Sequence, residues 1–250
     1  AENIDFAIWP ETAFPDHITR TGSQSKYTLR LQQFLAKNQL ALVTGGYGYN
    51  RRKDQNSNSM FVFNREGQMV SEPYMKTVLL AFGEYFPGSQ WFPILRKWFP
   101  QVAGFERGGG PMIQDLDGLK MGPQICYEGL FDWFSRQSAL KGAQVLVNVT
   151  NDSWYGTWQQ PYQHLYMTLS RAIETRLPIV RSTNTGISTV ALASGEVLQQ
   201  SALHVPWKGL YEIGYVKEPK PTFFTRYGFW FTDIFFALMG ALLVFNRRRQ

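Results

Sequence analysis

LKMGPQICYEGLFDWFSRQSALKG, residues 119–142, is the stretch that decides the fold. An apolar run of strand length comes first, and residues 129–141 follow with the spacing of a helix. Cys126 lies at the junction. A cysteine in a sharp turn between a strand and a helix projects its sulfur, and we expect the helix N-terminus to lower its pKa below about 8.5. This position leaves two interpretations open, because a lone buried cysteine can also be inert packing.

The alternation of strands and helices extends from this stretch in both directions. Short apolar runs predict buried strands at 6–9, 40–45, 145–149 and 179–181. Helical spacing predicts helices at 23–38, with Ser23 as N-cap, and at 162–176, ended by Pro178. Turn residues between apolar runs predict hairpins at 64–67, 117–118 and 194–195. The sequence therefore predicts one layered α/β domain with mixed sheets.

The C-terminal stretch GFWFTDIFFALMGALLVF, residues 228–245, carries one charge, Asp233, and arginines follow it at 247–249. Its length is near the lower limit for crossing a bilayer. We predict a transmembrane helix at 223–246 and a basic cytoplasmic tail at 247–250, with everything before Tyr227 on the outer side. A buried core helix is the alternative.

Composition narrows the function classes. The net charge is +6, but the basic residues are scattered and form no nucleic-acid-binding motif. The single cysteine excludes an intramolecular disulfide and a zinc site built from several cysteines. The chain opens on AENIDF, without Met or a signal-like stretch, which suggests a processed product or the C-terminal portion of a longer protein.

Two charged residues are candidate partners for a cysteine nucleophile. The three histidines have no strand-end context, so a carboxylate is the next option for a base. Glu11 directly follows the first predicted strand, and Lys76 follows QMVSEPYM. A lysine there would hold the negative charge that develops on a carbonyl oxygen. Taken singly, each residue is equally compatible with a solvated surface position.

In combination, three segments resemble the signatures of the nitrilase, or carbon-nitrogen hydrolase, superfamily: WPETAFP at 9–15, YMK at 74–76 and PQICYEGLF at 123–131. The resemblance implies an α-β-β-α sandwich over residues 1–222 and a triad of Glu11 as base, Lys76 as oxyanion partner and Cys126 as nucleophile. Within the superfamily, LLAFGEYFP at 79–87, NVTNDSWYG at 148–156 and RSTNTGIS at 181–188 are similar to motifs of the bacterial apolipoprotein N-acyltransferases.

That closer likeness implies a function and further site residues. The expected reaction moves a fatty acyl chain from a membrane phospholipid, through a cysteine thioester, to the N-terminal amine of an apolipoprotein. It implies a bacterial inner membrane location with the catalytic domain facing the periplasm, and no metal or cofactor. The supporting residues are Glu84, Glu128 and the backbone N–H of Tyr127, and Trp154 and Tyr155 would line the acyl pocket. The multi-helix membrane domain that precedes the hydrolase domain in that family is not in this sequence.

Two rival functions remain open at this point. The first is a nitrilase-type amidase that hydrolyses small amides with the same triad, and the second is a membrane-tethered binding module in which the triad is a relic. The irregular, aromatic-rich stretch at 84–110 favours the acyltransferase. Interleaved Trp, Phe, Lys and Arg suit a surface that dips into lipid, which a small-amide hydrolase does not need.

Overall fold

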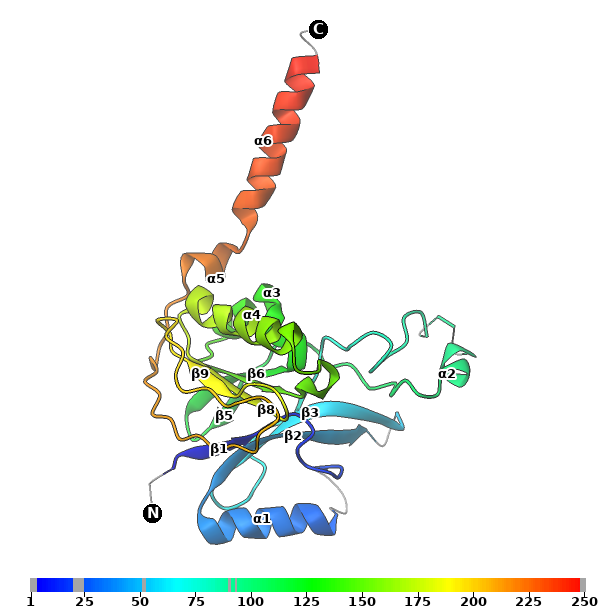
Figure 1. The fold of residues 1–250 in the computed structure, drawn as a ribbon, viewed down its shortest axis with the longest axis vertical. Helices are drawn as coiled ribbons and strands as arrows, with labels where there is room; N and C mark the ends of the chain where they lie inside the picture. The colour runs from blue at the N-terminus through cyan, green and yellow to red at the C-terminus, as the bar shows by residue number, and fades with distance from the viewer. Residues whose placement is uncertain (1–3, 20–24, 51–52, 90, 93, 248–250) are drawn as a thin grey trace.

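Two β-sheets stacked face to face form the centre of the molecule in a computed structural model that describes residues 4–19, 25–50, 53–89, 91–92 and 94–247 (Figure 1). The first sheet has the order β1-β2-β3-β4 and the second has the order β5-β6-β7-β8-β9. In the first, β1 (Phe6–Trp9) runs parallel to β2 (Ala41–Asn50), and β3 (Gln55–Phe63) and β4 (Tyr74–Met75) continue antiparallel.

The second sheet has a parallel centre and antiparallel edges. Its parallel strands are β6 (Leu119–Ile125), β7 (Val145–Thr150) and β8 (Ile179–Thr183), and its edges are β5 (Gln114–Leu116) and β9 (Thr189–Ala191). Both sheets are therefore mixed, which confirms the predicted fold class. The prediction of hairpins at 117–118 and 194–195 is also confirmed, since β5 pairs with β6 and Ala191 pairs with Val197.

Helices cover the outer face of each sheet, so the layers read α-β-β-α. Helix α1 (Lys26–Asn38) packs Leu31 and Leu35 against Leu42 and Phe61 of the first sheet. Helices α3 (Asp132–Leu140) and α4 (Gln159–Thr175) cover the second sheet (Figure 1). The residue after Leu42, Val43, faces the other way and joins the core between the sheets, as the twofold period of a strand requires.

The helix boundaries differ from the sequence predictions in three places. Ser25 caps α1 by accepting the N–H of Thr28 at 3.1 Å, whereas the predicted cap Ser23 lies outside the described residues. Helix α4 begins at Gln159, three residues before the predicted start at 162. Pro161 does not prevent this, because in the first turn of a helix its missing N–H would have no intrahelical partner. A short 3₁₀ helix, η1 (Cys126–Leu130), precedes α3 and delays its start.

The C-terminal segment forms two helices. Helix α5 (Phe223–Tyr227) ends at Gly228, whose φ is +59°, and α6 (Trp230–Arg247) includes Asp233. Across the described ranges, no helix combines the length and apolar character that crossing a membrane requires. The segment at 223–246, predicted as one helix, is thus corrected to two, because Gly228 interrupts it. Residues 248–250 of the predicted tail lie outside the described residues.

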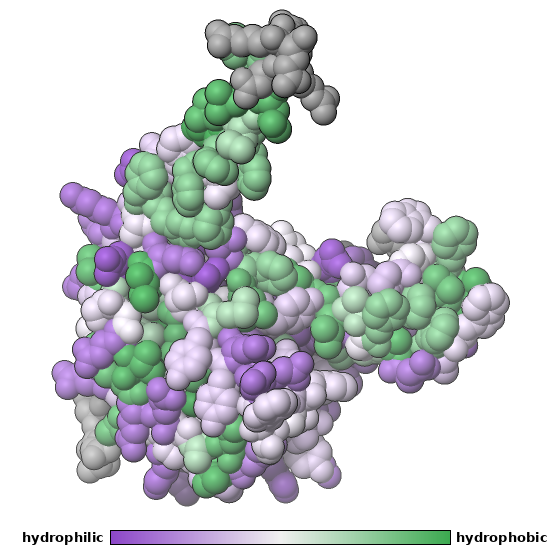
Figure 2. All heavy atoms as spheres, turned by 45° about the horizontal axis from the view of Figure 1, so that its top comes forward, coloured by the Kyte–Doolittle hydropathy of each residue, from purple (hydrophilic) through white to green (hydrophobic). Residues whose placement is uncertain are grey.

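Residues 80–105, which we call the aromatic arm, leave the sandwich sideways and carry the short helix α2 (Ile94–Trp98) at their far end (Figure 1). The arm is held at its base by backbone hydrogen bonds from Ala103 to Gly83 and from Phe105 to Glu84. Further out, the rings of Phe86 and Phe99 stack with centroids 4.4 Å apart. Apolar side chains gather on this arm and on α6 (Figure 2).

Candidate active site

Cys126 sits in a strained turn at the carboxyl end of β6. Its φ is +56°, a left-handed conformation that residues with a side chain rarely adopt, and its side chain is buried. The chain passes directly from β6 into η1 at this residue. Glu11 and Asn151 likewise follow the carboxyl ends of β1 and β7, the edge where α/β sheets place their ligand sites.

Two buried charged side chains, Glu11 and Lys76, and the partly buried Glu84 lie together beside this cysteine. Lys76 directly follows β4, and its Nζ lies 2.9 Å from Glu84 Oε1 and 3.4 Å from Glu11 Oε1. The Nδ2 of Asn58 donates to the same two oxygens, at 2.6 Å to Glu11 and 2.9 Å to Glu84. The other oxygen of Glu11 accepts the backbone N–H of Asn151 at 2.7 Å. Two carboxylates are thus held against one ammonium group.

The turn that carries Glu11 packs against a glycine. A Cβ on Gly45 of β2 would lie 2.6 Å from the Cα of Glu11 and 2.7 Å from the carbonyl oxygen of Pro10. The N–H of Gly45 also donates to that carbonyl at 3.2 Å. On the other side, Asn184 Nδ2 donates to the carbonyl of Glu11 at 2.9 Å. Close backbone contact therefore fixes the position of the carboxylate.

Electrostatics set the charge states of Lys76 and Cys126. Burial opposes the charge on Lys76, but Glu11, Cys126 and Glu84 outweigh it and raise the pKa of Lys76 above its ordinary value. Burial also raises the pKa of the Cys126 thiol to about 12, and the nearby Glu11 adds to this, while Lys76 acts in the opposite direction. The prediction of a lowered cysteine pKa is wrong, because burial and a carboxylate exceed the effect of a one-turn helix. Burial and the charge of Glu11 therefore both favour the neutral thiol.

Glu128 connects the cysteine turn to the segment after Lys76. One carboxylate oxygen accepts the N–H groups of Thr77 at 2.6 Å and Val78 at 2.9 Å, and the other accepts Tyr74 Oη at 2.7 Å and the N–H of Ile125 at 2.8 Å. The side chain is fully buried, and burial raises its pKa to about 7 despite these four donors. Glu128 therefore braces the turn rather than facing an open site.

The remaining predicted residues lie at different depths. The ring centroid of Tyr127 is 5.5 Å from Lys76 Nζ, and its hydroxyl donates to the carbonyl of Leu79 at 2.6 Å. Tyr155 is half-buried and interacts electrostatically with Cys126, and burial raises its pKa to about 12. Trp154, in η2 (Asp152–Trp154), is 73% exposed and points away from the core. Of the two predicted pocket residues, only Tyr155 lies near the sulfur.

Sequence reasoning missed Asn58, which joins Glu11 to Glu84. The available signal was its strand, QNSNSMFVF. The apolar second half is fully buried, and the burial continues into the polar first half, which indicates polar side chains in the interior. It also missed a buried polar cluster behind Cys126, formed by Asn148, Asp152, His164 and Arg181. Asn148, Asp152 and Arg181 stand inside the segments at 148–156 and 181–188 but had been given no role.

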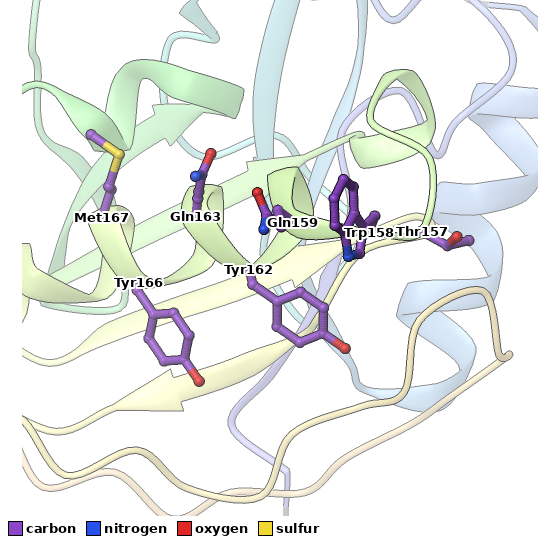
Figure 3. A pocket seen from close by; sticks show the side chains of 7 residues that line it. All are labelled: Thr157, Trp158, Gln159, Tyr162, Gln163, Tyr166 and Met167. Carbon is purple, nitrogen blue, oxygen red and sulfur yellow. The ribbon is translucent and has the colours of Figure 1, made fainter.

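An open groove of about 1020 Å³ lies elsewhere, on the exposed face of α4 (Figure 3). Its walls come from residues 157–167, and Trp158, Tyr162 and Tyr166 project from successive turns. Its lining includes none of the residues around Cys126. Within the described residues, no three His, Cys, Asp or Glu side chains gather as a metal site would require.

Sequence comparison places these features in a family. Residues 1–208 match the carbon-nitrogen hydrolases. The chain is 46% identical over 248 residues to the apolipoprotein N-acyltransferase of Bdellovibrio bacteriovorus, covering 96% of this chain and 45% of that protein. It is 29% identical over 250 residues to that of Geobacter metallireducens, covering 98% and 46%. The chain thus spans about half the length of the curated relatives it matches.

Solved structures show the same fold. An amidase from Nesterenkonia sp. AN1 matches with a TM-score of 0.54 and 18% identity, covering 71% of this chain and 65% of that one. A carbon-nitrogen hydrolase from Helicobacter pylori G27 matches with a TM-score of 0.56 and 19% identity, covering 70% and 62%. With the sandwich, the buried charged cluster and the sequence match in agreement, this chain belongs to the carbon-nitrogen hydrolase family.

Proposed function

We propose that the chain is the catalytic part of an apolipoprotein N-acyltransferase, in which Cys126 carries a fatty acyl group from a membrane phospholipid to the N-terminal amine of a diacylglyceryl-modified cysteine. The observation that carries the proposal is the buried cluster of Glu11, Lys76 and Cys126 in a chain that is similar over nearly its whole length to proteins of that name. The bacterial inner membrane is the proposed location, with the catalytic domain on its periplasmic side.

In the first half-reaction, Glu11 accepts the thiol proton of Cys126 as the sulfur attacks the ester carbonyl of the phospholipid. The carbonyl oxygen becomes negative, and Lys76 and the backbone N–H of Tyr127 stabilise it. The C–O bond then breaks, and Glu11 returns its proton to the departing alkoxide. The products are a lysophospholipid and an acyl thioester on Cys126.

In the second half-reaction, the lipoprotein amine attacks the thioester carbonyl. Glu11 accepts a proton from the amine, Lys76 again stabilises the oxyanion, and the C–S bond breaks to release the amide. The thiolate that leaves is reprotonated by Glu11. The proton that Glu11 returns is the one it took from the amine, so the resting state is restored without an external proton. Burial favours the neutral thiol that results. Glu84 shares Lys76 with Glu11 and is proposed to hold the ammonium in place during both steps.

The aromatic arm favours the proposal that the substrate is a lipid. Trp91, Phe92 and Trp98 are each more than 60% exposed, and Lys97 lies beside them on α2. Aromatic rings with a cation suit the headgroup region of a bilayer. Glu84 joins this arm to the proposed site, since its carboxylate contacts Lys76 and its carbonyl holds Phe105 at the base of the arm. A bound lipid would also keep water from the thioester.

The test is product analysis with two substrates. The full-length protein is incubated in detergent or vesicles with phospholipid and a synthetic diacylglyceryl-cysteine peptide, and separately with small aliphatic amides. The proposal predicts a peptide whose mass increases by one acyl chain, with Cys126→Ser as the inactive control. Hydrolysis of the amides without any peptide acylation would instead establish the amidase alternative.

A further inference from the structure

A charged cluster is buried next to the cysteine turn, and none of its side chains contacts Glu11 or Lys76 in the hydrogen bonds that define it. At its centre is Arg181 of β8, which is 2% exposed. One guanidinium nitrogen donates to Asn148 Oδ1 at 2.6 Å, and the other donates to Asp152 Oδ2 at 2.9 Å. The second oxygen of Asp152 accepts His164 Nδ1 at 2.8 Å. Arg181 therefore joins β7, η2 and α4 at a single point.

This cluster reaches Cys126 by two routes. The Nδ2 of Asn148 donates to the backbone carbonyl of Cys126 at 3.0 Å, so the arginine and the strained residue hold opposite ends of one amide. By the second route, the hydroxyl of Thr150 donates to Asp152 Oδ1 at 3.2 Å and also interacts with the Cys126 thiol. The backbone and the sulfur of the cysteine thus both have partners that Arg181 positions.

Stability alone does not account for such a cluster. Removing a guanidinium and a carboxylate from water costs several kcal/mol per ion, and well-packed apolar residues are often as stable as a buried pair. Here burial would raise the pKa of Asp152, but the hydrogen bond from His164 and the charge of Arg181 outweigh it and lower the pKa. Asp152 is also packed tightly, since a Cβ on Gly186 would lie 2.0 Å from its Oδ2.

The charge of Arg181 also acts on the sulfur. Burial lowers the pKa of Arg181, while Asp152 and then Cys126 raise it, so the guanidinium and the thiolate stabilise each other electrostatically. Around the sulfur, Glu11 opposes the thiolate and Lys76 favours it. Arg181 is therefore a second cation, besides Lys76, whose charge interacts with the sulfur.

We propose that Arg181 is a positioning residue for Cys126, holding its strained backbone through Asn148 and favouring its thiolate by charge. This inference rests on the proposed role of Cys126 as the nucleophile. It assigns the buried arginine to the reactivity of the sulfur, with no contact to either substrate.

The test measures alkylation of Cys126 by iodoacetamide, which requires the thiolate but no lipid. Peptide mass mapping of the full-length protein gives the rate constant at that residue for wild type, Arg181→Met, Arg181→Lys and Asn148→Ser. Arg136→Met is the control, because this arginine donates to the backbone carbonyls of Thr225 and Arg226 and, in the described part of the chain, makes no hydrogen bond or ion pair with Cys126 or with the cluster around Arg181. Thermal unfolding shows whether each variant is folded.

The inference predicts that Arg181→Met lowers the alkylation rate at neutral pH about tenfold, the effect of one pKa unit on the thiolate fraction, and that Arg181→Lys recovers most of it. Asn148→Ser, which leaves the Arg181–Asp152 pair intact, should lower kcat without changing KM. If Arg181→Met does not fold, Asn148→Ser still decides, since wild-type kcat in that variant would overturn the inference. So would wild-type alkylation in a folded Arg181→Met. Absence of acyl transfer by wild type would count against the proposed function only.

Discussion

The carboxylate of Glu128 accepts the backbone N–H of Thr77 at 2.6 Å. Glu128 lies two residues after Cys126, and Thr77 directly follows Lys76, so this bond joins two chain segments from different sheets. The donor is a backbone N–H and the acceptor is fully buried, which leaves less freedom than a contact between two long, exposed side chains. The spacing between the sulfur and the ammonium is therefore set by a buried brace, and this relationship leads to the first prediction.

Replacing Glu128 by Gln should change how stability depends on pH. The folded chain raises the pKa of Glu128 from 4.5 to about 7, so the folded state binds a proton that the unfolded state releases. The stability that this proton supplies is fully present below pH 4.5 and is lost as the pH rises through 7. Urea unfolding should show wild type losing stability relative to Glu128→Gln across this range. If the free energy of unfolding depended on pH in the same way for the two proteins, the raised pKa of Glu128 would be contradicted.

Removing the base should slow turnover. Glu11→Gln keeps an oxygen for the N–H of Asn151 but cannot accept a proton from Cys126. General bases contribute about 10²–10⁴-fold, so kcat should fall by at least a hundredfold. Steady-state kinetics with the lipopeptide measures this, with the exposed Glu212→Gln as a control that keeps wild-type rates. A loss below tenfold would remove Glu11 from the proposed role.

Asn58→Ala should impair both folding and turnover. The variant removes the amide that both carboxylates share, and it leaves Glu11 and Glu84 to repel each other with Lys76 as the common cation. Losing a buried hydrogen-bond partner costs about 1–3 kcal/mol. Asn56→Ala, two residues earlier on β3, removes a contact to His17 instead and serves as the matched control. The free energy of denaturant unfolding and kcat should both be lower for Asn58→Ala than for Asn56→Ala. Equal values for the two variants would count against the role of Asn58 in joining Glu11 to Glu84.

The layered fold could be predicted from the sequence because its strand and helix patterns are local, whereas Glu11, Lys76 and Cys126 were proposed as a set only through the resemblance to the family. Strand β1 was predicted with its observed bounds, and Glu11, Lys76 and Cys126 each follow a strand end. Contacts between segments remote in sequence left no such pattern. Asn58 meets Glu11 across 47 positions, and Asn148 meets Arg181 across 33. No periodicity in a single sequence encodes these pairs.

Two predictions failed for physical reasons that act only in three dimensions. The pKa of Cys126 is raised rather than lowered, because burial and the charge of Glu11 depend on tertiary packing. The apolar C-terminal run predicted one continuous helix, but Gly228 adopts a positive φ and separates α5 from α6. Local composition could not indicate where the backbone would turn.

The aromatic arm should matter for lipid and not for the sulfur. Trp91→Ser with Trp98→Ser removes two exposed rings from the arm and should weaken sedimentation with phosphatidylglycerol vesicles and lower kcat/KM for phospholipid. Alkylation of Cys126 by iodoacetamide should stay at the wild-type rate. Trp207→Ser, which removes a surface tryptophan outside the arm, is the control. Unchanged vesicle binding in the double variant would show that the aromatic arm does not contribute to lipid binding.

The central claim is that Cys126 carries the acyl chain, and intact-mass analysis tests it most directly. Full-length wild type and Cys126→Ser are each incubated with one phospholipid in the absence of any acceptor, and half of each sample is then treated with hydroxylamine. The account predicts a mass increase of one fatty acyl chain on wild type only, removed by hydroxylamine as expected for a thioester. A wild-type protein without the adduct, or the same adduct on Cys126→Ser, would contradict it.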